Sequence, residues 1–299
     1  MTYFNNLGQG RVGFKTPSGG GITPSYLLDT YSGATAAYSL RKLRAAYSGN
    51  AVRVRRASDD TSQDIGFNGS GGLDTAALTS FIGSSDAFVT IWYDQSGRAN
   101  NIENVTLIQQ PQIAQSGVIV TQFGKPSVRF NGTTMVLTKS TLDFTVNGLT
   151  SMGIVTVFNT IADNTNAPRG LMYIGPDSGW GTIAKCASIV GIGWRFGTGQ
   201  SSNTMTYNLS PNINNSITSI YHNNNTEILR MNGVDKITYT NKLNTIANTG
   251  QILSMGHSYL YGTLLHHRGT ISEMIIFTNN QIANRAAIET AINTNYTVY

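Results

Sequence analysis

The spacing of apolar positions divides the chain into many short predicted strands. Residues 52–55 read Val-Arg-Val-Arg, a period of two that predicts a strand with one buried face and one exposed basic face. The run from Phe88 to Tyr93 is almost continuously apolar, as is typical of a strand buried on both faces. Further strands are predicted around residues 124–132, 152–158, 171–173, 183–190, 193–196, 228–231, 251–255 and 269–277.

Helical spacing occurs in three places. Residues 36–47 carry apolar side chains at intervals of four, three and four and are followed by Gly49, which predicts a helix closed by that glycine. Asp74 is a predicted N-cap for a second helix, which Gly83 closes. Isoleucines and a tyrosine spaced by four over residues 288–296 predict a C-terminal helix.

Turn residues complete a pattern that predicts an all-β protein. Asn131-Gly132 and Asn232-Gly233 each follow a predicted strand and predict a tight hairpin. The strands at 124–132 and 152–158 resemble the inner strands of concanavalin A-like jelly rolls, the sandwich shared by laminin-G-like domains. The chain has no repeat of fixed period, which disfavours a solenoid or propeller. The expected fold is therefore a concanavalin A-like jelly-roll sandwich with a few short helices, including a C-terminal one.

The first 23 residues differ in pattern from the rest. Phe4, Leu7, Val12 and Phe14 are dispersed among glycines, and residues 17–21 form a Pro-Ser-Gly-Gly-Gly hinge. Such a short apolar arm cannot fold alone, so residues 1–23 are predicted to anchor the chain to another subunit, with residues 24–299 as the sandwich domain. The alternative is a disordered terminus.

Composition narrows the classes of function. Only 12% of residues are charged and the net charge is +5, which disfavours nucleic-acid binding. Cys186 is the single cysteine, so no intrachain disulfide can form, which suits a reducing cytosol. The sequence begins without a signal peptide and contains no run of 18 apolar residues, which predicts no membrane insertion.

The segment 37–97 carries the most specific signal. In order, it contains the predicted helix with its Ser-Gly end, the Val-Arg strand, Ser58-Asp59-Asp60, a Gly-Gly-Leu helix start and the turn from Tyr93 to Gly97. This order resembles the catalytic domain of the α-L-arabinofuranosidase B family. It also resembles a cassette of bacteriophage virion and tail-fibre proteins.

The resemblance implies two catalytic carboxyl groups, because glycoside hydrolysis normally uses an acid and a nucleophile or base. In the family these are a Glu on a mid-chain strand and an Asp shortly before the last strand. Here no carboxylate lies between Asp177 and Glu227, and Gly256-His257-Ser258 stands where the family has Gly-Asp. The family's adjacent cysteine pair is also absent. No catalytic residue is therefore assigned, and Glu273 on the last strand is interpreted as structural.

The sequence contains no motif that matches a metal or cofactor site, so none is predicted. Asp59, Asp60 and Asp64 offer oxygens for calcium, although their spacing differs from that of an EF-hand loop. Adjacent His266 and His267 would point to opposite faces of a strand, so a zinc site with His257 is disfavoured and surface histidines are expected. Asp59 and Asp94 are better explained as caps of loops and turns.

These observations favour a non-enzymatic bacteriophage virion protein, namely a capsid decoration protein, head fibre or tail fibre assembled in the host cytoplasm. The expected partners are other virion proteins, a host surface glycan and further copies of the chain, with a trimer by analogy with fibres. Sugar binding for host adhesion is predicted at Trp92, Asp94, Trp180 and Trp194. The alternative is an arabinofuranosidase-like glycoside hydrolase, which would lose activity on mutation of Glu273 or Asp177.

Overall fold

A computed structural model describes residues 26–161, 169–175, 183–188, 191–196, 203–208, 216–240, 246, 251–260 and 263–299. The helices are α1 (Leu27–Thr30), α2 (Thr75–Ile82) and α3 (Arg285–Tyr296), with short 3₁₀ turns at Leu107–Gln109 and Ile282–Asn284. The strands are β1 (Ala34–Ser39), β2 (Val52–Arg56), β3 (Ser62–Ile65), β4 (Ala87–Trp92), β5 (Ile102–Glu103), β6 (Gln112–Gln115), β7 (Val118–Ile119), β8 (Thr121–Gln122), β9 (Lys125–Pro126), β10 (Val128–Asn131), β11 (Leu137–Lys139), β12 (Ser151–Thr160), β13 (Arg169–Gly175), β14 (Ile183–Ser188), β15 (Gly191–Phe196), β16 (Asn203–Asn208), β17 (Ser216–Asn223), β18 (Thr226–Met231), β19 (Val234–Tyr239), β20 (Ile252–Met255), β21 (His257–Leu260), β22 (Thr263–His266) and β23 (Arg268–Phe277).

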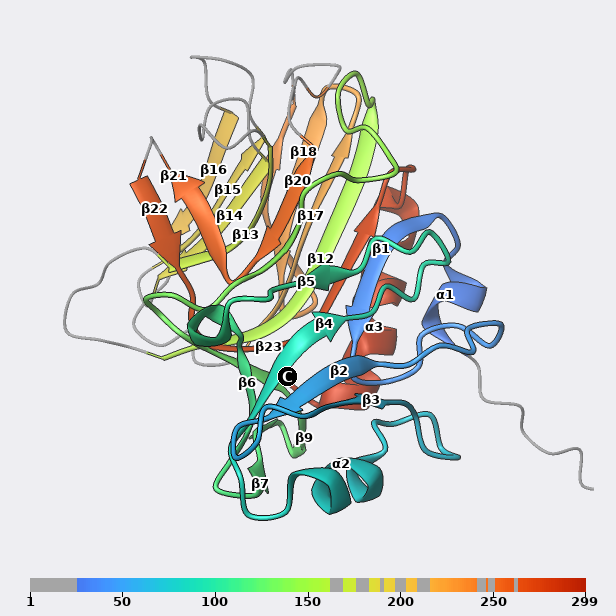
Figure 1. Cartoon of the computed structure of the whole chain (residues 1–299). Coiled ribbons are helices and arrows are strands. Elements are labelled where there is room, and N and C mark those ends of the chain that lie inside the picture. Colours follow the sequence, from blue (N-terminus) through green and yellow to red (C-terminus); the bar gives the residue numbers. More distant parts are fainter. Residues whose placement is uncertain are drawn as a thin grey trace, which may run out of the picture.

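The protein is mostly β, and its largest sheet is antiparallel in every described pairing (Figure 1). One part of this sheet is centred on β23, which pairs with β1, β10 and β12, and continues through β17, β18 and β19. A second part runs from β4 through β5, β11, β20 and β13 to β14, β15 and β16. Strand β6 joins the two parts, because it pairs with both β4 and β10.

The main core lies between these two parts of the sheet. Its buried side chains come from β2, β4, β11, β13 and β20 on one side and from β12, β17, β18 and β23 on the other. Strand β23 is buried along nine of its ten residues, which is the expected burial of a strand with neighbours on both edges and packed faces.

A second core lies on the other face of β12, β17 and β23. Helices α1 and α3 cover this face, and both lie beside β1 in Figure 1. The apolar side of α3 is buried and is formed by Ile288, Ile292 and Tyr296. The predicted C-terminal helix is confirmed, and its spacing by four corresponds to this buried face.

Three expectations about local structure are wrong. Residues 36–47 form no helix, because Ala34–Ser39 pairs with β23 as β1. The Asn131-Gly132 turn does not close a hairpin, because β10 pairs with β23 and β6 rather than with the next strand. Arg55 is not on an exposed face: its side chain is buried, with its guanidinium over the Phe88 ring.

Two other expectations, the start of the second helix at Asp74 and the Asn232-Gly233 hairpin, are confirmed. Helix α2 begins after Asp74, whose side chain accepts a hydrogen bond from the Ala77 N–H. Asn232 and Gly233 both have positive φ and connect β18 to β19 in a tight hairpin. In the described part of the chain, no helix has the length and hydropathy needed to cross a membrane.

Candidate functional site

Glu273 lies at the centre of the polar contacts that organise the 37–97 segment. Its carboxylate accepts hydrogen bonds from Ser39 Oγ at 2.8 Å, from Arg41 Nε and Nη2 at 2.8 and 2.9 Å, and from the Tyr296 hydroxyl at 3.2 Å. The carboxylate is only 1% exposed, and Arg41 meets it as a two-pronged fork. Burial next to Glu273 raises the pKa of Tyr296 well above its ordinary value. The structural role expected for Glu273 accounts for these contacts.

Gln95 positions the backbone that carries Arg41. Its side-chain oxygen accepts from the Leu43 N–H at 2.8 Å, and its amide nitrogen donates to the carbonyls of Ser39 and Arg41 at 3.0 Å each. Gln95 is fully buried. Its side chain therefore satisfies backbone N–H and carbonyl groups at and beyond the end of β1, where the strand pairing stops. Sequence reasoning assigned this residue only to a turn.

A cleft opens beside Arg41. It has a volume of about 270 Å³. We call it the Arg41 cleft, and its lining residues come from five separate segments: Tyr26; Leu40, Arg41 and Lys42; Ser70, Gly71, Gly72 and Leu73; Lys125 and Pro126; and Asn295 and Tyr296. A second hollow of about 230 Å³ shares Tyr26 and Arg41 with it.

Of the four residues predicted to bind sugar, Trp92 and Asp94 are described by the structure, and both are buried. Trp92 is 0% exposed and packs edge-on to Tyr38 in the core, so its ring cannot stack on a ligand. Asp94 is also buried and accepts from the N–H groups of Ala37, Ser96 and Asn100, which is the capping role considered as its alternative. Burial raises the pKa of Asp94, although these hydrogen bonds oppose the shift. Trp180 lies outside the described residues, as does the side chain of Trp194 on β15.

The three aspartates considered for calcium are each paired with a different arginine of β2. Asp59 contacts Arg56 at 2.5 Å, Asp60 contacts Arg55 at 2.6 Å, and Asp64 contacts Arg53 at 2.7 Å. Each carboxylate is therefore held by its own guanidinium. Among the described residues, no group of three His, Cys, Asp or Glu side chains is placed to hold a metal ion.

The three histidines of this region are partly or fully buried. His257 and His266 are paired across the β21–β22 hairpin with ring centroids 5.8 Å apart, and His257 stacks on Tyr173. His267 is fully buried and lies against Phe130 and Phe158. The expectation that His266 and His267 point to opposite sides is consistent with these contacts, and the expectation of surface histidines is wrong for His267.

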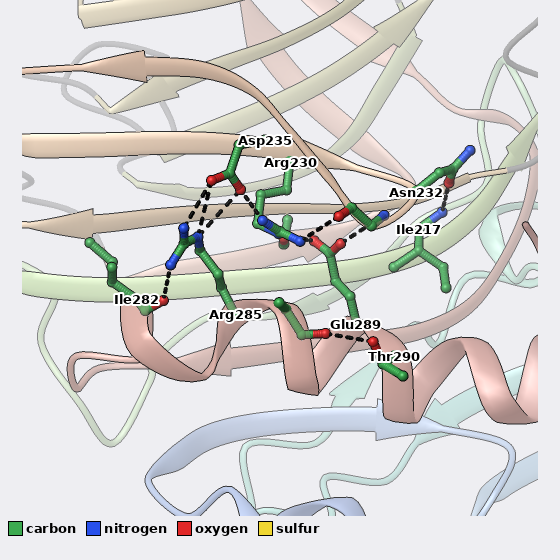
Figure 2. Close-up of polar contacts among 11 residues, drawn as sticks. Ile217, Arg230, Asn232, Asp235, Ile282, Arg285, Glu289 and Thr290 are labelled. Atoms are coloured by element: carbon green, nitrogen blue, oxygen red, sulfur yellow. Dashed lines mark hydrogen bonds and ion pairs between the residues drawn. The ribbon is translucent and has the colours of Figure 1, made fainter.

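A second buried ionic network attaches α3 to the sheet (Figure 2). Glu289 is 0% exposed and lies 3.2 Å from Arg230 Nε, and it also accepts from the Gly233 N–H and the Ser219 hydroxyl. Arg230 and Arg285 both contact Asp235. Because every partner is a protein group in the second core or at its rim, Glu289 is structural.

The predicted N-terminal anchor lies outside the described residues. It consists of Phe4, Leu7, Val12 and Phe14.

Comparison with known proteins supports the resemblance found in segment 37–97. Residues 29–136 match the family model "Alpha-L-arabinofuranosidase B, catalytic". An α-L-arabinofuranosidase B of Aspergillus oryzae is 41% identical over 63 residues, which is 21% of this chain and 12% of that protein.

The fold extends the likeness to most of the chain. A GH54 α-L-arabinofuranosidase soaked with a cyclic sulfate inhibitor superposes with a TM-score of 0.68 at 16% identity, covering 91% of this chain and 64% of that one. An arabinofuranosidase complexed with arabinofuranosyl-α-1,2-xylobiose gives a TM-score of 0.62 at 17% identity, covering 89% and 64%. The chain thus spans less than two thirds of these relatives.

These findings overturn the interpretation as a bacteriophage virion protein. The family model, the fungal relative and the superposed structures are all arabinofuranosidases, so the assignments to a capsid decoration protein, head fibre or tail fibre and to a virion location are wrong. The cassette in segment 37–97 lies within the residues that the arabinofuranosidase B family model matches. The chain carries an α-L-arabinofuranosidase B-type segment at residues 29–136 within a fold like that of GH54 arabinofuranosidases.

Proposed function

We propose that this protein is an arabinofuranosidase B-like glycoside hydrolase that acts on α-L-arabinofuranosides. The observation that carries the proposal is the family match over residues 29–136, supported by a superposition that covers 91% of the chain. We further propose that the sheet is a concanavalin A-like jelly roll, because its two parts enclose one apolar core.

The proposed chemistry requires two carboxyl groups on either side of the scissile bond. Glu273 holds Arg41 and Tyr296, which both line the Arg41 cleft, but its own carboxylate is 1% exposed and does not line the cleft, so Glu273 is a positioning residue. Asp177, which lies outside the described residues, is the candidate for one of the two carboxyl groups.

The test is release of 4-nitrophenol from 4-nitrophenyl α-L-arabinofuranoside by the whole chain. We expect Asp177→Asn to lower kcat at least a hundredfold, because it removes a group acting in the transition state. Glu273→Gln should lower kcat less, because it only weakens the contact that positions Arg41. Glu103→Gln, at an exposed carboxylate, is the matched control and should leave kcat unchanged.

Thermal unfolding of each variant separates loss of chemistry from loss of the fold. A folded Glu273→Gln protein with unchanged kcat would remove Glu273 from the mechanism. Failure of the wild-type chain to hydrolyse any aryl glycoside, including the case in which it binds the arabinoside without turnover, would overturn the proposed activity.

A further inference from the structure

The Arg41 cleft has a charge that a neutral arabinoside does not need. Arg41, Lys42 and Lys125 all line it, and none of the lining residues is an acid. Glu273, which does not line the cleft, neutralises Arg41 through the two-pronged contact at 2.8 and 2.9 Å. Among the described residues, no carboxylate pairs with Lys42 or Lys125, so the cleft presents two uncompensated ammonium groups. An empty cleft of this charge attracts an anion.

An aromatic ring lies next to these charges. The Lys42 ammonium is 5.5 Å from the centroid of the Tyr26 ring, and Tyr26 borders both the cleft and the adjoining hollow. The two spaces together reach the range of about 300–1,000 Å³ that is usual for small-molecule sites. Asn295 adds an amide to the lining. A ring face beside an amide and cations is suited to a sugar that carries a carboxylate.

We propose that the Arg41 cleft binds an acidic saccharide, with the carboxylate of a uronic acid between Lys42 and Lys125 and the sugar ring against Tyr26. The basic side chains are too few for a nucleic-acid surface, since counterion release from a duplex requires many more phosphate contacts. An inorganic oxyanion shares the charge but has no ring for Tyr26 to contact. The proposal does not depend on the hydrolase activity.

The test measures binding of D-glucuronate and an oligogalacturonide to the whole chain by isothermal titration calorimetry. We expect the dissociation constant to rise with salt, and Lys42→Gln and Lys125→Gln each to weaken binding at least fivefold. Lys139→Gln, which lines a different surface hollow, is the matched control and should change nothing. Thermal unfolding confirms that each variant is folded.

Further binding measurements distinguish a uronic acid from an inorganic oxyanion. Tyr26→Leu should weaken the uronate at least fivefold and leave the response to inorganic sulfate unaltered, because only the sugar contacts the ring. Sulfate bound as tightly as glucuronate, glucose bound as tightly as glucuronate, or a preference for an oligonucleotide would each overturn the proposal. Unchanged affinity in both lysine variants would do the same.

Discussion

Glu273 and Arg41 form an ion pair in which each charge is compensated by the other. The Arg41 side chain is 18% exposed and the Glu273 carboxylate 1%, so removal of the acid leaves a guanidinium largely out of water. We expect Glu273→Ala to lower the free energy of unfolding by about 3 kcal/mol, because a broken buried ion pair leaves one uncompensated charge. Urea unfolding measures this change. Glu103→Ala, at an exposed carboxylate, should cost less than about 0.5 kcal/mol, and an equal loss in both variants would contradict the argument.

His257 gives the protein a predicted sensitivity to acid. Burial, and then the charge of His266, lower the pKa of His257 to about 4. Between that value and about 6.5, the unfolded chain binds a proton that the folded chain excludes, so stability is complete above this window and is lost as the pH falls through it. We expect a loss of about 3 kcal/mol between pH 7 and pH 4 that is attributable to this residue.

The measurement is the difference in unfolding free energy between the wild type and His257→Gln across that range. The difference cancels the contribution of the carboxylates, which titrate in both proteins. A difference that stays constant from pH 7 to pH 4 would show that His257 is accessible to protons in the folded state.

Secondary-structure elements that depend on local signals could be predicted, and those that depend on distant pairing could not. Asp74 caps α2 through its own Ala77 contact, and Asn232-Gly233 closes a hairpin between neighbouring strands. By contrast, residues 36–47 have helical spacing, yet β1 pairs with β23 more than 200 residues away. The β-sheet pairing overrides the local preference, since a buried strand gains both hydrogen bonds and packing from its partner.

Helix α3 depends on the ionic network drawn in Figure 2 as well as on its apolar face. Burial raises the pKa of Glu289, although Arg230 and the Ser219 hydroxyl oppose the shift. We expect Glu289→Ala to cost about 3 kcal/mol, because Arg230, 4% exposed, loses a buried partner. Glu289→Gln should cost less, since an amide oxygen still accepts from the Gly233 N–H.

Hydrogen exchange, measured together with urea unfolding, shows which elements lose stability in the Glu289→Ala variant. Faster exchange in α3 and β18 of the alanine variant, with α2 unchanged, is the expected pattern. Exchange that rises equally in α2 would show that the network stabilises the whole molecule rather than the attachment of the helix.

For the whole molecule, the candidate site could be predicted only in part. The 37–97 cassette identified the segment that the family model matches, and it contains Arg41 and Lys42. The other walls of the Arg41 cleft come from residues 125–126 and 295–296, whose proximity is produced by β23 and α3. No spacing along the chain indicates that proximity. The assignment of Trp92 to a sugar platform is wrong for the same reason, because composition does not distinguish a core ring from an exposed one.

The matched segment, residues 29–136, is not expected to fold without the rest of the chain. Its β1 and β10 pair with β23, and its side chains share the main core with β12, β20 and β23. A fragment of residues 24–136 would expose those strand edges and apolar faces to water, so we expect no cooperative thermal transition from it, whereas residues 24–299 should unfold in a single transition. Circular dichroism and calorimetry of the two fragments test this expectation. A cooperative transition in the shorter fragment would show that the arabinofuranosidase-type segment is a domain of its own, and the division of the chain at residue 23 alone would then be wrong.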